Sequence, residues 1–557
     1  MNKVIFLIFA LVIIASCKNN EQHFNGSTKH SGLKQVNEYF NPIIQGFYPD
    51  PSICRVGEDY YMAHSSFEYF PGVPIFHSKD LIHWKQIGHA LTRKSQLNLD
   101  TVAASKGIYA PTLRFHNDTF YMITTNTVHG GNFVVHTTDP YGEWSDPVWI
   151  DMPMIDPSLF WDDDGKVYVQ TSTGIFQAEI DLKTGKRKTP LKRIWKKGSG
   201  GNWIEAPHIY KKDGYYYLML AEGGTFYGHM ITIARSKNIW GPYEGCSHNP
   251  ILTHRNTYLD PIQGTGHGDL IQDHQGDWWM VFLAFRVNGQ FYHTLGRETF
   301  LAPVTWENGW PVVNNGEDIS LKMKVPTLPL YPVKDNPNDD FNSETLGLKW
   351  NFLRNAPDSS LWSLSDKKGH LMLKGSASNL NDRLPKTFIG RRQQDYYFEA
   401  TTLLDFSPVS TNEEAGVTLL MNDKHHYDIY ISTNKFRQRT INARYNIGSL
   451  VDVVKSEVIK SGPVEIKVEG DTDHYKLSYR TNKNEDFKLL FKPEIIYLSV
   501  DVAGGFTGVY IGLFATGNGK QSQAKAHFDY LYYKGADKTK YDLKDHKPDI
   551  EKIMNEQ

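Results

Sequence analysis

Cysteine is scarce in this chain of 557 residues, which has only Cys17, Cys54 and Cys246. Three widely separated thiols supply neither a disulfide framework nor the paired ligands of a cysteine metal cluster. The fold must therefore be stabilised by hydrophobic cores. The chain is longer than one such core requires, so its length predicts two domains.

An excess of charge of one sign is also missing, because 60 Lys and Arg residues balance 62 Asp and Glu residues. A nucleic-acid interface needs clustered positive charge, so we expect no nucleic-acid partner. Helix signals are scarce throughout, whereas aromatic residues make up 13% of the chain. Surplus Trp and Tyr fit a sheet-rich protein and would also suit stacking on sugar rings, although ordinary packing accounts for most of them.

A mature membrane-spanning segment is not expected, because the apolar run from Val4 to Ile14 is too short. The run fits the hydrophobic region of an export signal. It ends in Ile14-Ala15-Ser16-Cys17, which resembles a bacterial lipobox with Cys17 as the lipidated residue. We predict a signal peptide over residues 1–17, a polar tether over residues 18–40, and an exported lipoprotein in the periplasm or at the cell surface, anchored through Cys17. The alternative is a soluble secreted protein in which this cysteine is coincidental.

One short element recurs five times in the first 315 residues. A polar turn and a strand-like aromatic or β-branched run follow each copy after roughly ten residues. Such a repeat, with about four strands per unit, is typical of a β-propeller. The sequence therefore predicts an all-β fold whose first domain has five blades. The copies are Asp50-Pro51-Ser52-Ile53, Ala110-Pro111-Thr112-Leu113, Asp156-Pro157-Ser158-Leu159, Glu205-Ala206-Pro207-His208-Ile209 and, more loosely, His267-Gly268-Asp269-Leu270.

Three copies of this element carry a carboxylate at or beside the same place. Asp50 and Asp156 directly precede proline, and Glu205 lies one residue earlier than that register. Equivalent positions of different blades meet at the axis, so we expect these acids to share one depression, where repulsion drives their pKa values apart as acid/base catalysis requires. An Asp before Pro can instead simply close a turn. Ala110 and Ala206 occupy the same slot without such a side chain, which weighs against that reading.

The composition changes after the propeller pattern. We place the propeller at residues 41–325, a proline-rich linker at residues 326–338, a second domain at residues 339–535 and an exposed charged tail at residues 536–557. Prolines this dense cannot pair as a central strand. Short alternating runs with Gly and Asn turns predict that the second domain is an antiparallel β-sandwich.

Taken together, segments of both domains resemble glycoside hydrolase family 43, the family of β-xylosidases and α-L-arabinofuranosidases. The second domain resembles the concanavalin-like, jelly-roll sandwich of the β-xylosidase branch, and the resemblance covers nearly all of the mature chain. The segments that carry it are Gly46-Phe47-Tyr48-Pro49-Asp50-Pro51-Ser52, Ser66-Phe67-Glu68-Tyr69-Phe70-Pro71-Gly72-Val73, Gly107-Ile108-Tyr109-Ala110-Pro111, Ile155-Asp156-Pro157-Ser158, Ile204-Glu205-Ala206-Pro207-His208, Leu295-Gly296-Arg297-Glu298-Thr299, Asp340-Phe341, Gly390-Arg391-Arg392-Gln393-Gln394 and Gly505-Phe506-Thr507-Gly508-Val509-Tyr510-Ile511-Gly512-Leu513.

The resemblance implies a role for each acid. Asp50 matches the general base that activates a water, and Glu205 matches the general acid that protonates the leaving oxygen. Asp156 matches the third acid, which orients Glu205 and holds its pKa up. Physical logic agrees with this division, because a carboxyl group near another anion stays protonated to higher pH.

The resemblance also implies residues that contact the sugar. Arg297 matches an arginine of the innermost subsite, and its alternative is a surface ion pair with Glu298. Phe67 and Tyr109 match aromatic positions that wall the site, and Thr225 matches a small polar contact. Tyr109 departs from the tryptophan common among the β-xylosidases, which leaves the preference for the leaving group open.

His267 resembles a family histidine near the axis, which in some relatives sits beside a calcium ion or a water. We expect it close to the site and assign no metal ligand, since a lone histidine is more often a satisfied polar group. The resemblance implies no required cofactor, and a structural calcium or sodium ion near His267 would be compatible with it.

Phe506 lies in the second domain but matches a residue that reaches into the propeller site and closes one side. A site closed at one end admits only a chain terminus, which would make the enzyme exo-acting. The alternative is an ordinary core residue beside Gly505.

The resulting prediction is an inverting exo-glycosidase that removes terminal β-D-xylosyl or α-L-arabinofuranosyl residues from xylan or arabinoxylan oligosaccharides. One alternative enzyme is an arabinan-directed α-L-arabinofuranosidase. A retaining fructosidase-like propeller is disfavoured, because its expected Asn-Asp-Pro-Asn and Arg-Asp-Pro segments do not occur. A non-catalytic glycan-binding lipoprotein is the alternative from another class, and the oligomeric state stays open.

Overall fold

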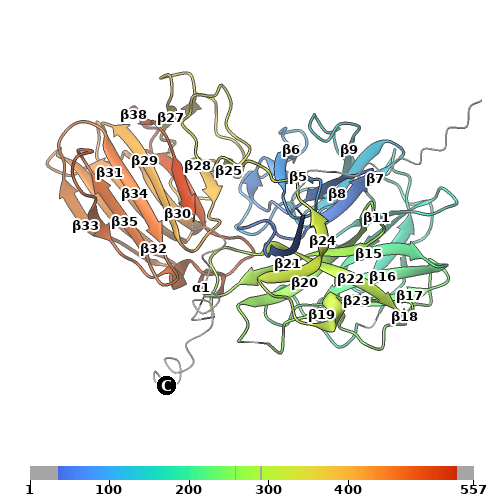
Figure 1. Cartoon of the computed structure of the whole chain (residues 1–557). Coiled ribbons are helices and arrows are strands. Elements are labelled where there is room, and N and C mark those ends of the chain that lie inside the picture. Colours follow the sequence, from blue (N-terminus) through green and yellow to red (C-terminus); the bar gives the residue numbers. More distant parts are fainter. Residues whose placement is uncertain (1–34, 197, 258, 289–290, 536–557) are drawn as a thin grey trace, which may run out of the picture.

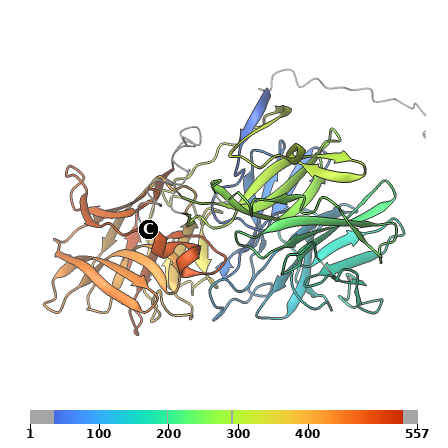
Figure 2. The same ribbon diagram turned by 90° about the horizontal axis from the view of Figure 1, so that it is seen from below.

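The computed structural model describes residues 35–535 except 197, 258 and 289–290. Two bodies built almost entirely of β-strands lie side by side, a five-bladed propeller and a sandwich (Figure 1). The view in Figure 2 shows the same two bodies from below. The predicted all-β architecture of a propeller followed by a sandwich is confirmed.

Each propeller blade is an antiparallel sheet made from strands that follow one another in the chain, except that β4 is skipped in the first blade, and β19 adds to the fourth blade. The predicted aromatic runs supply the second strand of each blade. The blades, in order, are β2 (Ser52–Val56), β3 (Asp59–Ala63), β5 (Gly72–Ser78) and β6 (Lys85–Leu91); β7 (Thr112–His116), β8 (Thr119–Asn126), β9 (Gly131–Thr137) and β10 (Val148–Trp149); β11 (Ser158–Trp161), β12 (Val167–Thr171), β13 (Phe176–Glu179) and β14 (Lys192–Arg193); β15 (Glu205–Lys212), β16 (Tyr215–Glu222), β17 (Met230–Ser236), β18 (Glu244–Gly245) and β19 (Leu252–Thr253); and β20 (Ile262–Gln272), β21 (Trp278–Arg286), β22 (Glu298–Glu307) and β23 (Trp310–Val313).

The first strands of the blades form a ring, because β2, β7, β11, β15 and β20 each contact the next and β20 contacts β2. These are therefore the innermost strands, and the recurring sequence element lies at or near the start of four of them and inside β20. The geometry brings residues from distant parts of the chain to the axis.

The propeller ring is closed by contacts between its N-terminal segment and its last blade. Ile44 bridges to Thr299 of β22, and β1 (Gln35–Phe40) pairs with β24 (Lys322–Pro329) as a two-stranded ribbon. This ribbon extends into segments predicted as tether and linker. Prolines are tolerated there because β24 pairs on one side only, as an edge strand does.

The second domain consists of two antiparallel sheets around one hydrophobic core. A 3-10 turn, η1 (Asn314–Gly316), precedes the domain, and η2 (Ile495–Leu498) and the short α1 (Val500–Ala503) interrupt it. The first sheet contains β33 (Leu450–Val458), β32 (Arg439–Ile447), β31 (His425–Thr433), β30 (Glu414–Asn422), β37 (Tyr510–Thr516), β28 (Thr387–Arg392), β25 (Asn351–Leu353) and β4 (Tyr69–Phe70), and the second contains β26 (Trp362–Ser363), β27 (Leu371–Lys374), β38 (Lys525–Phe528), β29 (Phe398–Phe406), β34 (Val464–Gly470), β35 (Tyr475–Arg480) and β36 (Lys488–Phe491), with β39 (Tyr532–Gly535) beside β29.

The two domains share a sheet, because β4 belongs to the propeller segment of the chain but pairs with β25 of the sandwich. Buried polar contacts continue this interface. Arg392 Nε donates to the Phe47 carbonyl oxygen at 2.6 Å, and the Arg354 amide donates to the Glu68 carbonyl oxygen at 2.7 Å. The sandwich is thus fixed against the first blade, next to the axial end of β2.

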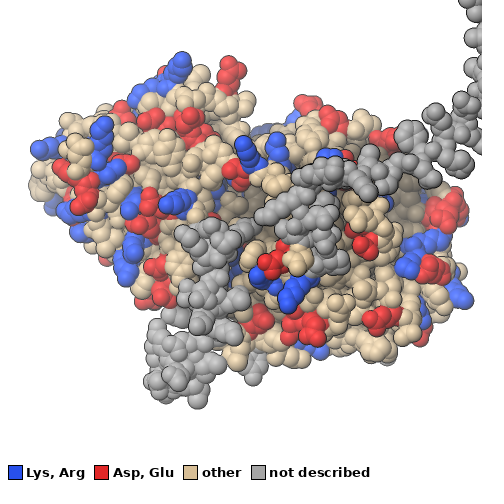
Figure 3. All heavy atoms as spheres, in the orientation of Figure 1, with Lys and Arg blue, Asp and Glu red and all other residues tan. Residues whose placement is uncertain are grey.

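Positive and negative side chains are interspersed over the face drawn in Figure 3. Among the described residues, no helix is both long enough and apolar enough to cross a bilayer.

Candidate active site

The recurring element adopts one unusual backbone conformation in four blades. Asp50, Asp156, Ala206 and His267 have φ values of 53°, 53°, 49° and 47°, in the left-handed region. Residues other than glycine are uncommon there, so its recurrence marks equivalent positions around the axis. The carboxyl groups of Asp50, Asp156 and Glu205 interact electrostatically with one another. The structure therefore brings the three predicted acids into one cluster.

Asp50 lies in a positively charged environment although it is only 4% exposed. Arg297 Nη1 lies 2.8 Å from Asp50 Oδ1, and the Ser65 hydroxyl donates a hydrogen bond to Oδ2. Burial alone would raise the pKa of Asp50, but the Arg297 charge, His267 and the Ser65 hydrogen bond outweigh burial and lower it. Asp50 is therefore ionised at neutral pH, as a general base must be.

The pKa of Glu205 shifts in the opposite direction to that of Asp50. Burial, followed by repulsion from Asp50, raises its pKa to about 7, although Arg297 opposes the change. Glu205 is half-buried and opens β15 directly before the left-handed Ala206. A carboxyl group with this pKa holds a proton near neutrality and can donate it.

Asp156 is linked to Glu205 through the backbone. Its Oδ2 accepts a hydrogen bond from the Ala206 amide at 3.2 Å, so it contacts the residue directly after Glu205. Burial, then repulsion from Glu205 and Asp50, raises the pKa of Asp156 well above its ordinary value. Asp50 and Asp156 thus both lie close enough to Glu205 to repel its carboxylate form, and the effect of Asp156 on the pKa of Glu205 stays a prediction. The orienting contact agrees with the role implied for Asp156.

The predicted sugar-contact residues surround Arg297. Its Nη1 also donates to Thr225 Oγ1 at 2.9 Å, and its guanidinium carbon lies 5.6 Å from the ring centroids of both Phe67 and Phe506. Tyr109 adds a third ring, with its centroid 5.2 Å from that of Phe67. The Nε–H of Arg297 is buried without a hydrogen-bond partner among the described residues, which leaves a donor for a ligand hydroxyl.

The surface ion pair considered for Arg297 does not form, because Glu298 pairs with Arg286 instead, at 2.6 Å between Oε2 and Nε. His267 lies beside the acids, with Nδ1 3.7 Å from Asp50 Oδ1. Burial lowers the pKa of His267 despite the neighbouring Asp50 carboxylate, so the ring is neutral at neutral pH.

Phe506 comes from the sandwich and reaches the propeller residues. Its amide donates to Ser105 Oγ at 2.8 Å, and its ring centroid lies 6.0 Å from that of Phe67. The preceding Gly505 has a φ of +95°, and a Cβ atom there would lie 2.5 Å from Ser105 Oγ. The close approach therefore requires glycine at position 505. The blocking role of Phe506 stays a prediction.

The sequence interpretation missed several supporting residues. Ser65 binds Asp50, and the buried Glu68 accepts the Ser105 amide at 2.9 Å through Oε2. Burial raises the pKa of Glu68 to about 8, so this carboxyl group is mostly neutral at pH 7. The one available signal was the polar run His64-Ser65-Ser66 directly after β3, where a strand pattern would continue with apolar residues.

A buried polar network joins the blades beneath the acids. Asp269 Oδ2 accepts from Ser52 Oγ at 2.7 Å and from Arg114 Nη1 at 2.7 Å, and its Oδ1 accepts from the Tyr210 hydroxyl at 2.6 Å. Arg114 Nη2 also lies 3.0 Å from His208 Nδ1. Since these residues come from four blades, the network fixes the positions of the inner strands relative to one another.

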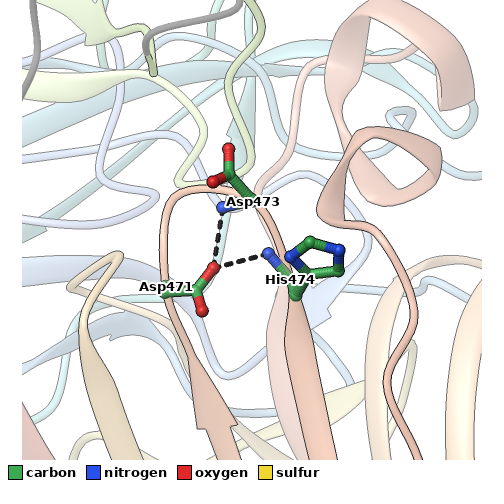
Figure 4. A group of neighbouring side chains, drawn as sticks. All are labelled: Asp471, Asp473 and His474. Carbon is green, nitrogen blue, oxygen red and sulfur yellow. Dashed lines mark hydrogen bonds between the residues drawn. The ribbon is translucent and has the colours of Figure 1, made fainter.

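A group of metal-ligating residue types occurs elsewhere, in the sandwich loop with Asp471, Asp473 and His474 (Figure 4). One carboxylate oxygen of Asp471 accepts the amides of Asp473 and His474 at 2.8 and 2.6 Å. These hydrogen bonds close a turn, which accounts for the acid without an ion. The ion considered near His267 stays untested.

The described residues also form a cavity of about 560 Å³ between the first blade, the linker and the sandwich. Trp84, Trp350 and Arg391 are among its lining residues, and the predicted acids are not. This cavity is separate from the acid cluster.

Comparison with known proteins agrees with this geometry. Residues 39–311 match the model of glycosyl hydrolases family 43, and residues 338–534 match that of the beta xylosidase C-terminal concanavalin A-like domain. A non-reducing end α-L-arabinofuranosidase of Bacteroides ovatus is 44% identical over 89% of this chain and 95% of its own length. A xylosidase/arabinosidase of Butyrivibrio fibrisolvens is 41% identical, covering 88% and 98%.

Solved structures of similar fold match this chain over both of its domains. The structure described as Bacteroides ovatus xyloglucan PUL GH43B matches with a TM-score of 0.86 and 42% identity, over 90% of this chain and all of that one. A xylan β-1,4-xylosidase from Bacillus halodurans matches with a TM-score of 0.85 and 34% identity, over 89% of this chain and all of that one.

Proposed function

Because this chain belongs to glycosyl hydrolase family 43 and is a glycoside hydrolase, we propose that it removes non-reducing terminal α-L-arabinofuranosyl or β-D-xylosyl residues from plant-type oligosaccharides. The family is one of inverting exo-glycosidases. The observation that carries the proposal is the opposite shift of two carboxyl pKa values in one cluster, downward at Asp50 and upward at Glu205.

The reaction follows from these protonation states. Ionised Asp50 removes a proton from a water that attacks the anomeric carbon, while protonated Glu205 donates a proton to the departing glycosidic oxygen. An inverting reaction needs room for that water, with the two carboxyl groups about 6.5–9.5 Å apart. Attack from the face opposite the leaving group reverses the anomeric configuration.

The neighbouring residues support this chemistry. Asp156 holds the Ala206 amide and so fixes the backbone beside Glu205. Arg297 keeps Asp50 ionised and leaves its buried Nε–H for a sugar hydroxyl. Phe67, Phe506 and Tyr109 supply apolar faces around a single terminal sugar, in agreement with exo action.

The relatives support two sugars rather than one. The relatives above include an enzyme named for α-L-arabinofuranose and another named for both sugars. A terminal arabinofuranosyl residue and a terminal xylosyl residue present similar hydroxyl groups near the anomeric carbon, so one site can accept both. We propose both activities, with arabinoxylan and xylan oligosaccharides as the substrate class.

The test is to incubate the purified enzyme with xylo-oligosaccharides, arabinoxylan oligosaccharides and arabinan oligosaccharides and to follow the products. We expect single terminal sugars, and proton NMR of the fresh product should show the inverted anomer. Retention of configuration, or release of internal fragments, would contradict the proposal. Cleavage restricted to arabinan would favour the arabinan-directed alternative, and binding without turnover would favour a glycan-binding lipoprotein.

We also propose that the protein is an exported lipoprotein anchored through Cys17. The apolar run and the lipobox-like Ile14-Ala15-Ser16-Cys17 support this, and they lie outside the described residues. Replacing Cys17 by Ala should move the protein from the membrane fraction to the soluble fraction. Unchanged fractionation would refute the anchor without affecting the enzymatic proposal.

A further inference from the structure

Two large aromatic side chains lie exposed near the acid cluster without an assigned role. Trp203 is 66% exposed and Phe226 is 53% exposed. Both rings flank Gly224, where a Cβ atom would lie 3.4 Å from Trp203 Cδ1 and 4.0 Å from Phe226 Cδ2. Glycine at this position therefore keeps the space between the rings open. Large apolar groups exposed together commonly mark a binding surface.

Trp203 and Phe226 each lie close in the chain to a residue of the proposed active site. Trp203 precedes Glu205 by two residues, a span of at most about 7 Å along an extended chain. Phe226 directly follows Thr225, whose hydroxyl accepts from Arg297. Because Glu205 is the proposed proton donor to the glycosidic oxygen, the group that departs lies on its side of the site. The segments that carry the two rings thus lie directly beside Glu205 and beside the Arg297 contact Thr225.

The segments that carry the two rings are held rigidly. The Gly223 amide donates to the Asn202 carbonyl oxygen at 2.7 Å, which joins the two segments. Glu222 is fully buried and accepts the amides of Ser199 and Gly201 at 2.9 and 3.2 Å through Oε2. A buried carboxylate thus fixes the loop that leads to Trp203 and Glu205.

The backbone at Trp203 is itself unusual, with a φ of 56°. A bulky residue in the left-handed region is strained, and such strain persists where the surroundings impose it, often at ligand clamps. The Tyr227 hydroxyl, one residue after Phe226, donates to the Phe291 carbonyl oxygen at 2.6 Å. The backbone beside each of the two rings is therefore held by specific hydrogen bonds, whereas the rings themselves are exposed.

We propose that Trp203 and Phe226 form a leaving-group platform, which binds the apolar C–H face of the pyranose sugar on the far side of the bond that is cut. This inference rests on the proposed glycosidase function and deepens it. The platform makes the enzyme select substrates whose leaving group is a sugar. Binding of the leaving-group sugar to the platform takes place away from the reacting atoms. Enzymes use such remote binding energy to position the bond that is cut.

The test compares two substrates that both need a proton from Glu205 but differ in the leaving group. One is an oligosaccharide in which the terminal sugar is linked to a xylose residue, and the other is the methyl glycoside of the same sugar. We expect Trp203→Ala and Phe226→Ala each to lower kcat/KM about tenfold on the oligosaccharide. On the methyl glycoside, which has no ring to stack, kcat/KM should stay within about twofold of the wild type.

Two exposed aromatic residues of the propeller provide matched controls. Trp149→Ala and Tyr141→Ala remove side chains that are 45% and 56% exposed, and both should leave both rates unchanged. Inhibition by the free terminal sugar should also be unchanged in the Trp203 and Phe226 variants, which checks that the site for that sugar is intact.

Equal losses on the two substrates, or an unchanged oligosaccharide rate, would refute the platform while leaving the glycosidase function in place. A wild-type enzyme that cleaves neither substrate would refute the proposed function and this inference with it.

Discussion

The propeller and the sandwich contribute to the site in different ways. The propeller repeats one element around an axis and so gathers Asp50, Asp156 and Glu205, which are far apart in the sequence. The sandwich has no such repeat and contributes a single loop, with Phe506 against Ser105 and Phe67. The propeller repeat thus brings charged groups together at the axis. The shape of the site beside Phe67 depends instead on the Phe506 loop, which lies outside the repeat.

The largest effects should come from the propeller acids and should differ between them. Asp50→Asn removes the base and should lower kcat by about 10³-fold or more on every substrate. Glu205→Gln removes the proton donor, so it should lower kcat comparably on oligosaccharides but much less on glycosides with a good leaving group. Steady-state kinetics on a series of aryl glycosides checks this, and equal losses along the series for Glu205→Gln would contradict its role as acid.

The next effect should be on the link between the domains. Arg354 of the sandwich is fully buried, and its Nε donates to the Val102 carbonyl oxygen of the propeller at 2.6 Å. Its two Nη atoms bind both carboxylate oxygens of Asp423, also in the sandwich, at 3.1 and 2.5 Å. Arg354→Met would leave this ion network incomplete and should lower the free energy of unfolding by about 3–5 kcal/mol. Urea denaturation measures the change, with the exposed Arg383→Met as control. A change below about 1 kcal/mol would show that the stability does not depend on the Arg354 side chain.

A smaller effect should come from the loop of the sandwich. Phe506→Ala removes a ring that borders Arg297 and Phe67, so kcat/KM should fall about tenfold to a hundredfold because the sugar is less well positioned. Preference for chain ends should also relax, as profiles of products from long xylo-oligosaccharides would show. Phe436→Ala, at a sandwich side chain that is 71% exposed, should change neither. Strict exo action in the Phe506 variant would remove the sandwich from the control of specificity.

The smallest expected effect is the pH dependence of kcat/KM, which tests the protonation states of Glu205 and Asp50. Glu205 must be protonated, so kcat/KM should fall as the pH rises through about 7, the raised pKa of this group. Asp50 must be ionised and its pKa is lowered, so the acid side of the profile should fall only below its ordinary value of 3.8. In Glu205→Gln the alkaline fall should disappear. An alkaline limb that persists in this variant would assign it to another group.

The propeller was more predictable than the sandwich's contribution because its signal is local. A residue before Pro or Gly, followed by a polar turn and an aromatic strand, recurs at regular spacing, so the blades and the position of Asp50 and Asp156 follow from the sequence. The pairing of β4 with β25 could not be predicted in this way, since two residues at Tyr69–Phe70 carry no pattern of their own. How strongly each neighbouring carboxylate shifts the pKa of Glu205 depends on distances in the folded site.

The contacts of Glu222 were hidden for a related reason. Glu222 ends a strand whose sequence reads like any other, and only the fold shows that it binds the amides of Ser199 and Gly201. Hydrogen bonds from a side chain to the backbone of a loop leave little trace in residue types.

The strand pairing across the domain boundary has a consequence for how the protein is made. During synthesis, Tyr69–Phe70 emerges long before its partner strand at Asn351–Leu353, so β4 has no strand to pair with until the ribosome has added that later segment. Phe506 arrives later still. A nascent propeller can bring its three acids together early, but it lacks the β4–β25 pairing and the Phe506 ring. We therefore expect the complete site to form only when the C-terminal half docks.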